Sequence, residues 1–421
     1  MRRRATLAFI IVVGVFTGGA FVARPFVHGA TFVVRAADLQ GFARDVAELD
    51  TRTVRDELIT IDTPRGALRA RMYQPSGSIH RTVLLTSGLH PSGIDEPRLV
   101  RLARNLAATG LAVVTPDIPE LSQFTITPEI TDEIEAACGW LYEHGPTPRG
   151  TRVGLMGISF SGGLSIVAAG RPSLTGRVEY VFSFGGHDDL QRVLRYLCTG
   201  IEPLPRRELR LTRPAGDAGG TAEGRTRDGG GAEEGRGQSS DEVFARPPHD
   251  YGVAVILLGI ADRLVPRPQV DPLKAAVFRY LLASALDSNV DKARAAQEFD
   301  QLRAQAKRMP EPSATLLRYV NDRDVVHLGA RLLPYIGSYG ADPALSVSKA
   351  PKPTASVFLL HGNDDNVIPS VEAEYLANDL RGHAPVRLLL SGLISHAEAD
   401  RPVHVTDVMQ LASFWGDLLA R

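Results

Sequence analysis

Two regions of the chain alternate short apolar runs with segments of helical periodicity. Apolar runs rich in β-branched residues predict strands, whereas apolar positions three or four residues apart predict helices. In the first region the segment Thr63-Pro64-Arg65-Gly66 is typical of a hairpin turn between two strands. The predicted strands are Val54–Asp62, Ala67–Tyr73, Arg81–Ser87, Leu111–Thr115, Arg152–Met156 and Val178–Phe184. Their alternation with helices predicts parallel strands joined by crossovers, and therefore an α/β sheet.

The second region repeats this alternation toward the end of the chain. It begins with the apolar run ASVFLLHG at Ala355, followed by a predicted helix Val371–Leu380 and a strand Val386–Leu390. Residues 53–187 and 351–421 are expected to build one core with a mostly parallel central sheet and flanking helices. The other helices predicted in this core are Glu96–Ala108, Thr127 to about His144, Gly162–Ala169, and Val405 to about Ala420.

Residues 188–350 interrupt the alternation and predict a helical cap inserted into the core. Asp188–Thr199 has helical periodicity, and so does most of Tyr251–Tyr339. Between them, residues 213–249 are rich in Gly, Arg, Asp and Glu and contain almost no large apolar residues. Such a segment buries too little surface to offset its loss of conformational entropy, so we expect it to be disordered.

The first 24 residues have the pattern of a membrane anchor or a signal peptide. Three arginines, Arg2–Arg4, precede an uncharged run of 19 residues, Ala5–Ala23. A helix of that length crosses the hydrocarbon core, and the arginines would stay cytoplasmic. In the alternative, Ala5–Phe16 is the apolar centre of a cleaved signal and Gly18-Gly19-Ala20 its cleavage site. Both interpretations place the rest of the chain, including the predicted α/β core, outside the cytoplasm.

Residues 25–52 are then a membrane-proximal segment, with one helix predicted at Ala37–Leu49.

The net charge of the chain is −1 and the chain has no long basic run, so nucleic acid is not an expected partner. The two cysteines, Cys138 and Cys198, form no C-x-x-C pair, which gives no support for a zinc or dithiol site. Whether they form a disulfide stays open, and so does the oligomeric state.

The stretch Val153–Gly163, VGLMGISFSGG, carries the first candidate chemistry. An apolar strand runs through a turn of small residues into a helix. A strained strand-to-helix turn holds a serine oxygen clear of its own backbone, and small neighbours leave room for an acyl group. Ser159 and Ser161 both fit a small-x-Ser-x-small pattern. Ser159 is preferred, because Gly157 is then the close-packed glycine before the turn.

A serine nucleophile needs a base, and the base needs an acid that orients it. The run ASVFLLHG leads into Asn363–Pro369, which contains Asp364 and Asp365. The next strand leads into Ser391–His396, SGLISH. An acid after one parallel strand and a histidine after the next meet at the same edge of the sheet. The order of Ser159, Asp365 and His396 along the chain is the Ser…Asp…His order of the α/β-hydrolases.

Through GISFSGG, HGNDDNVIP and SGLISH, the sequence resembles α/β-hydrolases of the esterase and dienelactone-hydrolase type over residues 53–187 and 351–421. The family acid is the fifth residue of H-G-x-x-D-x-x-x-P, which is Asp365, with Asp364 as the second choice. The resemblance implies His396 as the base. Asp188 or Asp189, after the strand that precedes the cap, is an alternative acid.

In that family two backbone N–H groups stabilise the oxyanion. The resemblance assigns them to Phe160, the residue after the nucleophile, and to Leu89, in the loop after an early strand. Family members often have histidine where this chain has Ser87, and glycine where it has Ser161. Neither difference removes a catalytic side chain.

The resemblance implies a carboxylic ester hydrolase that acts through an acyl-enzyme on a small-molecule substrate, with no metal or organic cofactor. The apolar helices of the cap favour a lipophilic acyl group. A peptidase, thioesterase or acyltransferase would use the same three residues. A non-catalytic binding module tethered to the membrane would keep the α/β-hydrolase fold without the reaction.

Overall fold

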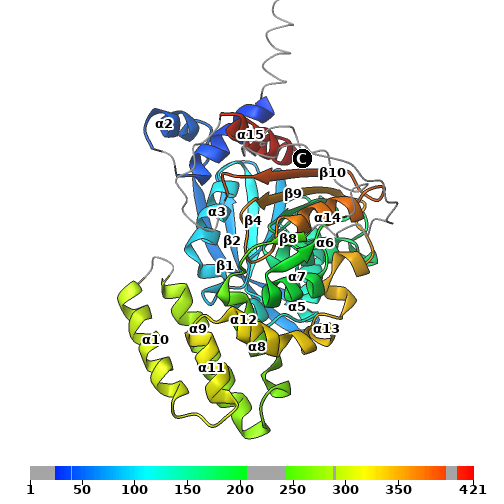
Figure 1. The fold of residues 1–421 in the computed structure, drawn as a ribbon. Coiled ribbons are helices and arrows are strands. Elements are labelled where there is room, and N and C mark those ends of the chain that lie inside the picture. Colours follow the sequence, from blue (N-terminus) through cyan, green and yellow to red (C-terminus); the bar gives the residue numbers. More distant parts are fainter. Residues whose placement is uncertain (1–23, 39, 206–242, 288–290, 395–404) are drawn as a thin grey trace, which may run out of the picture.

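An eight-stranded sheet forms the centre of the computed structural model, which describes residues 24–38, 40–205, 243–287, 291–394 and 405–421 (Figure 1). The strand order is β1-β2-β4-β3-β5-β6-β9-β10. β2 is antiparallel to both of its neighbours, and every other pair in this sheet is parallel. The predicted mostly parallel α/β sheet is therefore confirmed. The strands are β1 (Val54–Thr63), β2 (Gly66–Pro75), β3 (Arg81–Thr86), β4 (Leu111–Pro116), β5 (Val153–Ile158), β6 (Val178–Phe184), β9 (Ser356–Gly362) and β10 (Val386–Ser391).

Helices cover both faces of the sheet, which explains why its inner strands read as continuous apolar runs. Successive side chains of β3 point to opposite faces: Leu84 packs into one core cluster, and Val83 and Leu85 into the other. One face is covered by α5 (Glu129–His144), α6 (Phe160–Ala169) and α14 (Val371–Asp379). The other is covered by α3 (Pro97–Ala107), α15 (Val405–Leu419) and the helical residues 24–36.

The cap lies between β6 and β9 in the sequence. Its base consists of α7 (Leu190–Thr199), the antiparallel strand pair β7 (Ile201–Pro203) and β8 (Val243–Ala245), and α8 (Asp250–Ile260). α7 and α8 share the core cluster of α6, whereas α9 to α11 project away from the sheet (Figure 1). The remaining cap helices are α9 (Arg267–Asp287), α10 (Lys292–Ala306), α11 (Ser313–Asn321), α12 (Val325–Leu332) and α13 (Ile336–Tyr339).

The segment predicted to be disordered, 213–249, lies outside the described residues up to position 242. The prediction was wrong for residues 243–249, because β8 forms there by pairing with β7. Val243 and Phe244 are the apolar residues that make this short strand possible, and they follow directly after the Gly-rich and charged run.

The single helix predicted at Ala37–Leu49 was also wrong. The chain is helical over residues 24–36, turns, and becomes helical again in α2 (Phe42–Glu48). Asp38 and Gly41 both have positive φ, of 52° and 81°, so the backbone cannot continue as one helix through them.

The helical residues 24–36 are fixed to the body of the protein by α15. The rings of Phe32 and Trp415 lie 4.3 Å apart, and Phe32 is fully buried. The two backbones approach so closely that a Cβ at Gly29 would overlap the carbonyl oxygen of Ala412. This segment is therefore part of the folded domain rather than a free linker.

The predicted anchor or signal, Ala5–Ala23, lies outside the described residues. Within the part of the chain that the structure describes, no helix is long and apolar enough to cross a membrane.

Gly29→Ala should destabilise the protein by about 1–3 kcal/mol, because the added methyl group forces the helical residues 24–36 away from α15. Gly139→Ala is the matched control. Gly139 lies in α5, and a Cβ there meets nothing within 4 Å. It should stabilise the protein by up to about 1 kcal/mol, because alanine is the better helix former. Urea unfolding of both variants measures the difference. Equal effects would contradict the close contact.

Candidate active site

Ser159 lies at a strained turn between β5 and α6. Its backbone has φ 58° and ψ −130°, a conformation that residues other than glycine rarely adopt. The turn is held by a hydrogen bond from the Ser159 N–H to the carbonyl oxygen of Phe184, at 2.7 Å. Phe160 begins α6, and the Ser159 side chain makes no capping hydrogen bond to that helix. The half-buried hydroxyl is therefore positioned at the positive end of α6.

Small residues make this turn possible. A Cβ at Gly157 would overlap the carbonyl oxygen of Ser161 and lie 2.6 Å from Ser165 Oγ. On the other side, a Cβ at Gly88 would lie 3.3 Å from the Ser159 Cβ. The loop after β3 therefore passes directly beside Ser159, which is the placement that an oxyanion-binding loop requires.

Ser161 has different surroundings from Ser159. It is fully buried in α6, and its hydroxyl donates a hydrogen bond to the carbonyl oxygen of Ser87. The side chain that replaces the usual glycine therefore ties α6 to the loop after β3. A buried hydroxyl with this bond is poorly placed to attack a substrate.

Leu89, the expected oxyanion donor in the loop after β3, is held by the cap. The hydroxyl of Tyr251, in the first turn of α8, donates a hydrogen bond to the carbonyl oxygen of Leu89 at 3.1 Å. Burial raises the pKa of Tyr251, so the phenol keeps its proton and remains a donor. Sequence reasoning missed this residue, because Tyr251 lies 162 positions from Leu89 and no local motif marks it.

Asp365 is nearly buried in the loop after β9. One carboxylate oxygen, Oδ1, accepts hydrogen bonds from the N–H groups of Val367 and Ile368, at 2.9 and 3.0 Å. The other oxygen, Oδ2, lies 3.7 Å from Nε2 of His361. A Cβ at Gly185, just after β6, would be 3.4 Å from that same oxygen. The carboxylate therefore lies at the edge of the sheet where β6 and β9 end.

Asp364, the second choice for the acid, accepts hydrogen bonds from a residue of the cap. Arg246 donates to its carboxylate and to its carbonyl oxygen, both at 3.0 Å. Three residues later, the N–H of His249 donates to the carbonyl oxygen of Asn366 at 2.9 Å. The segment 246–251 therefore contacts both the acid loop and the loop of Leu89.

His396 lies outside the described residues. β10, the strand that leads toward it, is parallel to β9, with Ser391 opposite Gly362. The chain thus leaves β10 at the same edge of the sheet that carries Asp365. Because its partner is not described, the three-residue assignment of Ser159, Asp365 and His396 stays a prediction.

The alternative acids Asp188 and Asp189 have other roles at the start of α7. Asp189 accepts a hydrogen bond from the N–H of Arg192 at 3.0 Å and caps the helix. Asp188 is buried beside the guanidinium of Arg192, at 3.1 Å. Burial, followed by the charge of Glu372, raises the pKa of Asp188 to about 7.

Arg192 is surrounded by more carboxyl groups than it can neutralise. Glu372 accepts from Arg192 Nε at 2.6 Å and from the N–H of Asp188 at 2.6 Å, and Glu202 lies 3.3 Å from the same guanidinium. Glu202 and Glu372 are both fully buried. Glu372 has the better hydrogen bonds for a charged carboxylate. Burial and the neighbouring charge of Glu372 raise the pKa of Glu202 to about 10, so Glu202 holds a proton at neutral pH.

Two other histidines near the sheet edge have structural contacts. Nε2 of His187 lies 2.9 Å from the carbonyl oxygen of Leu345, and burial lowers the pKa of His187. Nε2 of His361 lies 2.9 Å from the carbonyl oxygen of Ile368 and so braces the acid loop. Both rings are buried.

Cys138 and Cys198 are free and buried, and burial raises the pKa of each thiol to about 12. Within the described ranges, no three His, Cys, Asp or Glu side chains are grouped as a metal site would require.

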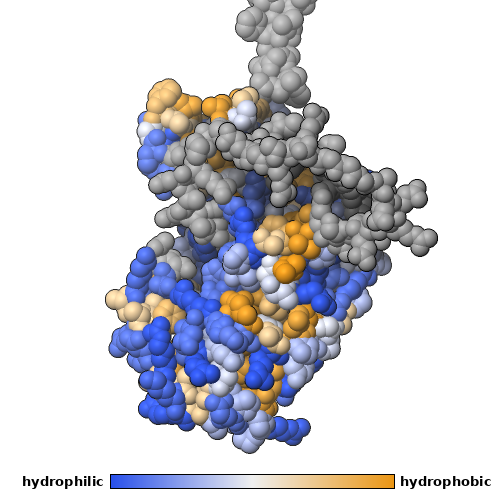
Figure 2. All heavy atoms as spheres, viewed as in Figure 1, coloured by the Kyte–Doolittle hydropathy of each residue, from blue (hydrophilic) through white to orange (hydrophobic). Residues whose placement is uncertain are grey.

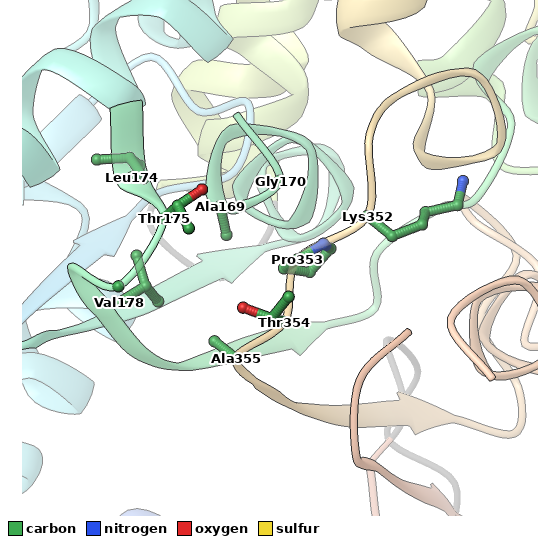
Figure 3. Close-up of a pocket in the computed structure, with 10 residues that line it drawn as sticks. Ala169, Gly170, Leu174, Thr175, Val178, Lys352, Pro353, Thr354 and Ala355 are labelled. Atoms are coloured by element: carbon green, nitrogen blue, oxygen red, sulfur yellow. The ribbon is translucent and has the colours of Figure 1, made fainter. Parts of the chain in front are cut away.

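A cavity of about 30 Å³ lies beside Ala169 and Gly170, at the far end of α6 from Ser159. It is close to Val178 and Ala355, where β6 and β9 begin (Figure 3). It is therefore separate from the strained turn.

Glu202→Gln should make the protein more stable at alkaline pH. The folded pKa is about 10, above the ordinary glutamate value of about 4.3, so folding binds a proton between these values and wild-type stability falls as pH rises. Glutamine mimics the protonated form at every pH. Its advantage should be near zero at pH 4 or below, where the unfolded chain also mostly keeps this proton, and should increase by at least about 1 kcal/mol by pH 8, measured by urea unfolding. An advantage that does not increase with pH contradicts the assignment.

No protein-family model matches the chain, and no curated protein is significantly similar to it in sequence. An esterase from Pyrobaculum calidifontis is 14% identical over 95% of this chain and 93% of its own, with a TM-score of 0.41. Brefeldin A esterase, titled a bacterial homologue of human hormone-sensitive lipase, is 14% identical over 94% and 86%, with a TM-score of 0.41. Carboxyl esterase 2 from the mycorrhizal fungus Tuber melanosporum is 12% identical over 86% of each chain, also with a TM-score of 0.41. At these values the likeness carries no argument about activity, and the assignment of the fold rests on the strand order and on the turn at Ser159.

Proposed function

We propose that this chain, which has the α/β-hydrolase fold, is a serine hydrolase that cleaves carboxylic esters. The observation that carries the proposal is the geometry of Ser159. It is a non-glycine residue with φ 58°, at the N-terminus of α6, with Gly88 packed against it. Strain of this kind costs about 1–3 kcal/mol and persists where the surrounding structure enforces it. A nucleophile held clear of its own backbone at a helix N-terminus is a functional reason for such strain.

In the proposed reaction, the Ser159 oxygen attacks the ester carbonyl while His396 accepts its proton. Asp365 fixes the orientation of the imidazole and stabilises the imidazolium that forms. The N–H groups of Phe160 and Leu89 stabilise the oxyanion, an interaction whose loss typically costs about 3 kcal/mol. His396 then protonates the departing alcohol. Water, activated by the same histidine, releases the acid from the acyl-enzyme.

Tyr251 of the cap base and Leu89 of the loop after β3 are both half-buried apolar side chains that pack against the core cluster containing Phe160. This supports a small ester with a lipophilic acyl group as the substrate class. We also propose that Ala5–Ala23 anchors the protein in a membrane with the catalytic domain outside the cytoplasm, or directs its export before being cleaved.

Fluorophosphonate labelling of the full-length protein tests the nucleophile. We expect one adduct, on Ser159, located by mass spectrometry. Ser159→Ala should abolish labelling and lower ester turnover by at least about 10³-fold, because the covalent step is lost. Ser161→Ala is the matched control, and it should keep the adduct, because its hydroxyl bonds to Ser87.

An adduct on Ser161 would move the nucleophile by two residues. No adduct on protein that unfolds cooperatively would favour a non-catalytic module. Substrates with ester, thioester and aminoacyl groups then distinguish the reactions that share an acyl-enzyme, and peptide cleavage without ester turnover would overturn the esterase assignment.

Tyr251→Phe should lower kcat by about tenfold with little change in KM. It removes the hydrogen bond that holds the carbonyl of Leu89, a loss of about 1–1.5 kcal/mol in a group that acts on the transition state. Tyr375→Phe is the control, because it removes a hydrogen bond of equal length, 3.1 Å, to the carbonyl oxygen of Pro203 in β7. Steady-state kinetics on one ester compare them. Identical kinetics in both variants would contradict a positioning role for Tyr251.

A further inference from the structure

Exposed apolar side chains gather at the end of the molecule formed by the helical residues 24–36, α2 and α15 (Figures 1 and 2). Among the described residues, eight of the twelve exposed large apolar side chains lie on or beside these three helices. Phe42 and Leu49 are 83% and 86% exposed, and Val405 is 74% exposed. We call this surface the apolar platform and define it by Val27, Phe42, Val46, Leu49, Val405 and Met409.

α2 contributes an apolar stripe that faces away from the protein. Phe42, Val46 and Leu49 follow the spacing i, i+4, i+7, which places them on one side of a helix. In a surface helix this stripe normally packs against the core, but here Ala47 is the buried residue of α2. Exposed apolar side chains gathered at one end of the molecule in this way mark a site of contact with another apolar surface or with a membrane.

The platform is held rigidly. Phe32 is buried against Trp415, and Gly29 and Gly416 allow the helical residues 24–36 to touch the backbone of α15. Its orientation relative to the sheet is therefore fixed. Near α2, Arg44 contacts Glu48 at 2.6 Å and Asp38 at 3.6 Å, and His28 contacts Asp50 at 2.6 Å.

The sequence before the platform identifies its occupant. The uncharged run Ala5–Ala23 directly precedes residue 24, the first described residue of the helical stretch 24–36. A segment of that composition and length belongs in a bilayer, so the platform lies where the chain would leave it. Arg44 is engaged by Glu48 and Asp38, so we rest the choice of occupant on the apolar side chains and not on attraction to anionic lipid.

We propose that the apolar platform rests on the membrane surface, with Phe42, Val46 and Leu49 in the boundary between headgroups and acyl chains of zwitterionic phospholipid. The inference rests on the proposed membrane placement of Ala5–Ala23. Beyond that placement, the proposal is that the folded domain lies against the membrane in one orientation and does not move freely at the end of the N-terminal segment.

Single-cysteine labelling of the full-length protein in phosphatidylcholine vesicles tests this docking. Cys138 and Cys198 are buried with pKa values near 12, so an introduced surface cysteine is the reactive thiol. An environment-sensitive fluorophore is attached to Leu49→Cys and, separately, to Val46→Cys. Val326→Cys is the matched control, because Val326 is 75% exposed but lies on α12 in the cap. Vesicle flotation and ester hydrolysis are measured on each sample.

We expect all three variants to float with the vesicles. The labels at positions 46 and 49 should shift to the blue and be quenched several-fold by lipid carrying a quencher near the headgroup, and the label at 326 should not. Floating protein whose platform labels behave like the control overturns the docking and leaves the anchor intact.

Platform labels shielded from both lipid and aqueous quenchers also overturn the docking, because a second copy or another part of the chain then covers the surface. Failure to float overturns the membrane placement and the docking together. If that same sample still hydrolyses the ester, the proposed catalytic function stands even though the membrane placement and the docking are overturned.

Discussion

The strained backbone at Ser159 is the constraint on which the candidate active site depends. A residue with positive φ would relax if its neighbours allowed it, and here they do not. Its N–H is bound to Phe184 on the adjacent strand, and Gly157 is packed against the backbone of Ser161. Gly88 closes the other side. The parallel sheet supplies the rigid frame, because β5 lies between β3 and β6 and is buried on both faces.

The cap does more than cover this edge of the sheet. Within one short segment, Arg246 and His249 bind the acid loop and Tyr251 binds the loop of Leu89. These two loops come from opposite sides of the nucleophile strand, after β9 and after β3. A displacement of the cap base would therefore move the loops of Asp365 and Leu89 together. The position of the cap and the arrangement of the proposed catalytic groups are coupled by these contacts.

Much of the core could be predicted from the sequence, because each of its signals is local. Strands buried on two faces give uninterrupted apolar runs, and a serine among small residues after such a run indicates the turn. The choice of Ser159 over Ser161 followed from the need for a glycine two positions earlier. The structure adds a physical reason, since Ser161 is buried and bonded to Ser87. The role of His396 stays a prediction from its position after β10.

What the sequence could not predict depends on contacts between distant segments. Arg246 and Tyr251 follow a Gly-rich run and belong to no motif, so nothing local connects them with Asp364 or Leu89. The helix at residues 24–36 was missed because its partner, α15, lies at the other end of the chain. The two helices pack closely because Gly29 and Gly416 lie where their backbones meet. In the sequence alone, a single glycine in a helix does not indicate which segment it will contact.

The buried carboxyl cluster around Arg192 adds a constraint of a different kind. Glu202 lies in β7, Asp188 lies just before α7, and Glu372 lies in α14, which follows the loop of Asp365. Removing water from three carboxyl groups around one guanidinium is unfavourable unless they share protons and hydrogen bonds. Once formed, the cluster is difficult to separate, because opening it would leave a buried charge without its partner. It therefore fixes the strand pair β7–β8 to α14 of the core, and the cap's position, like the turn at Ser159, is maintained by surroundings that permit little relaxation.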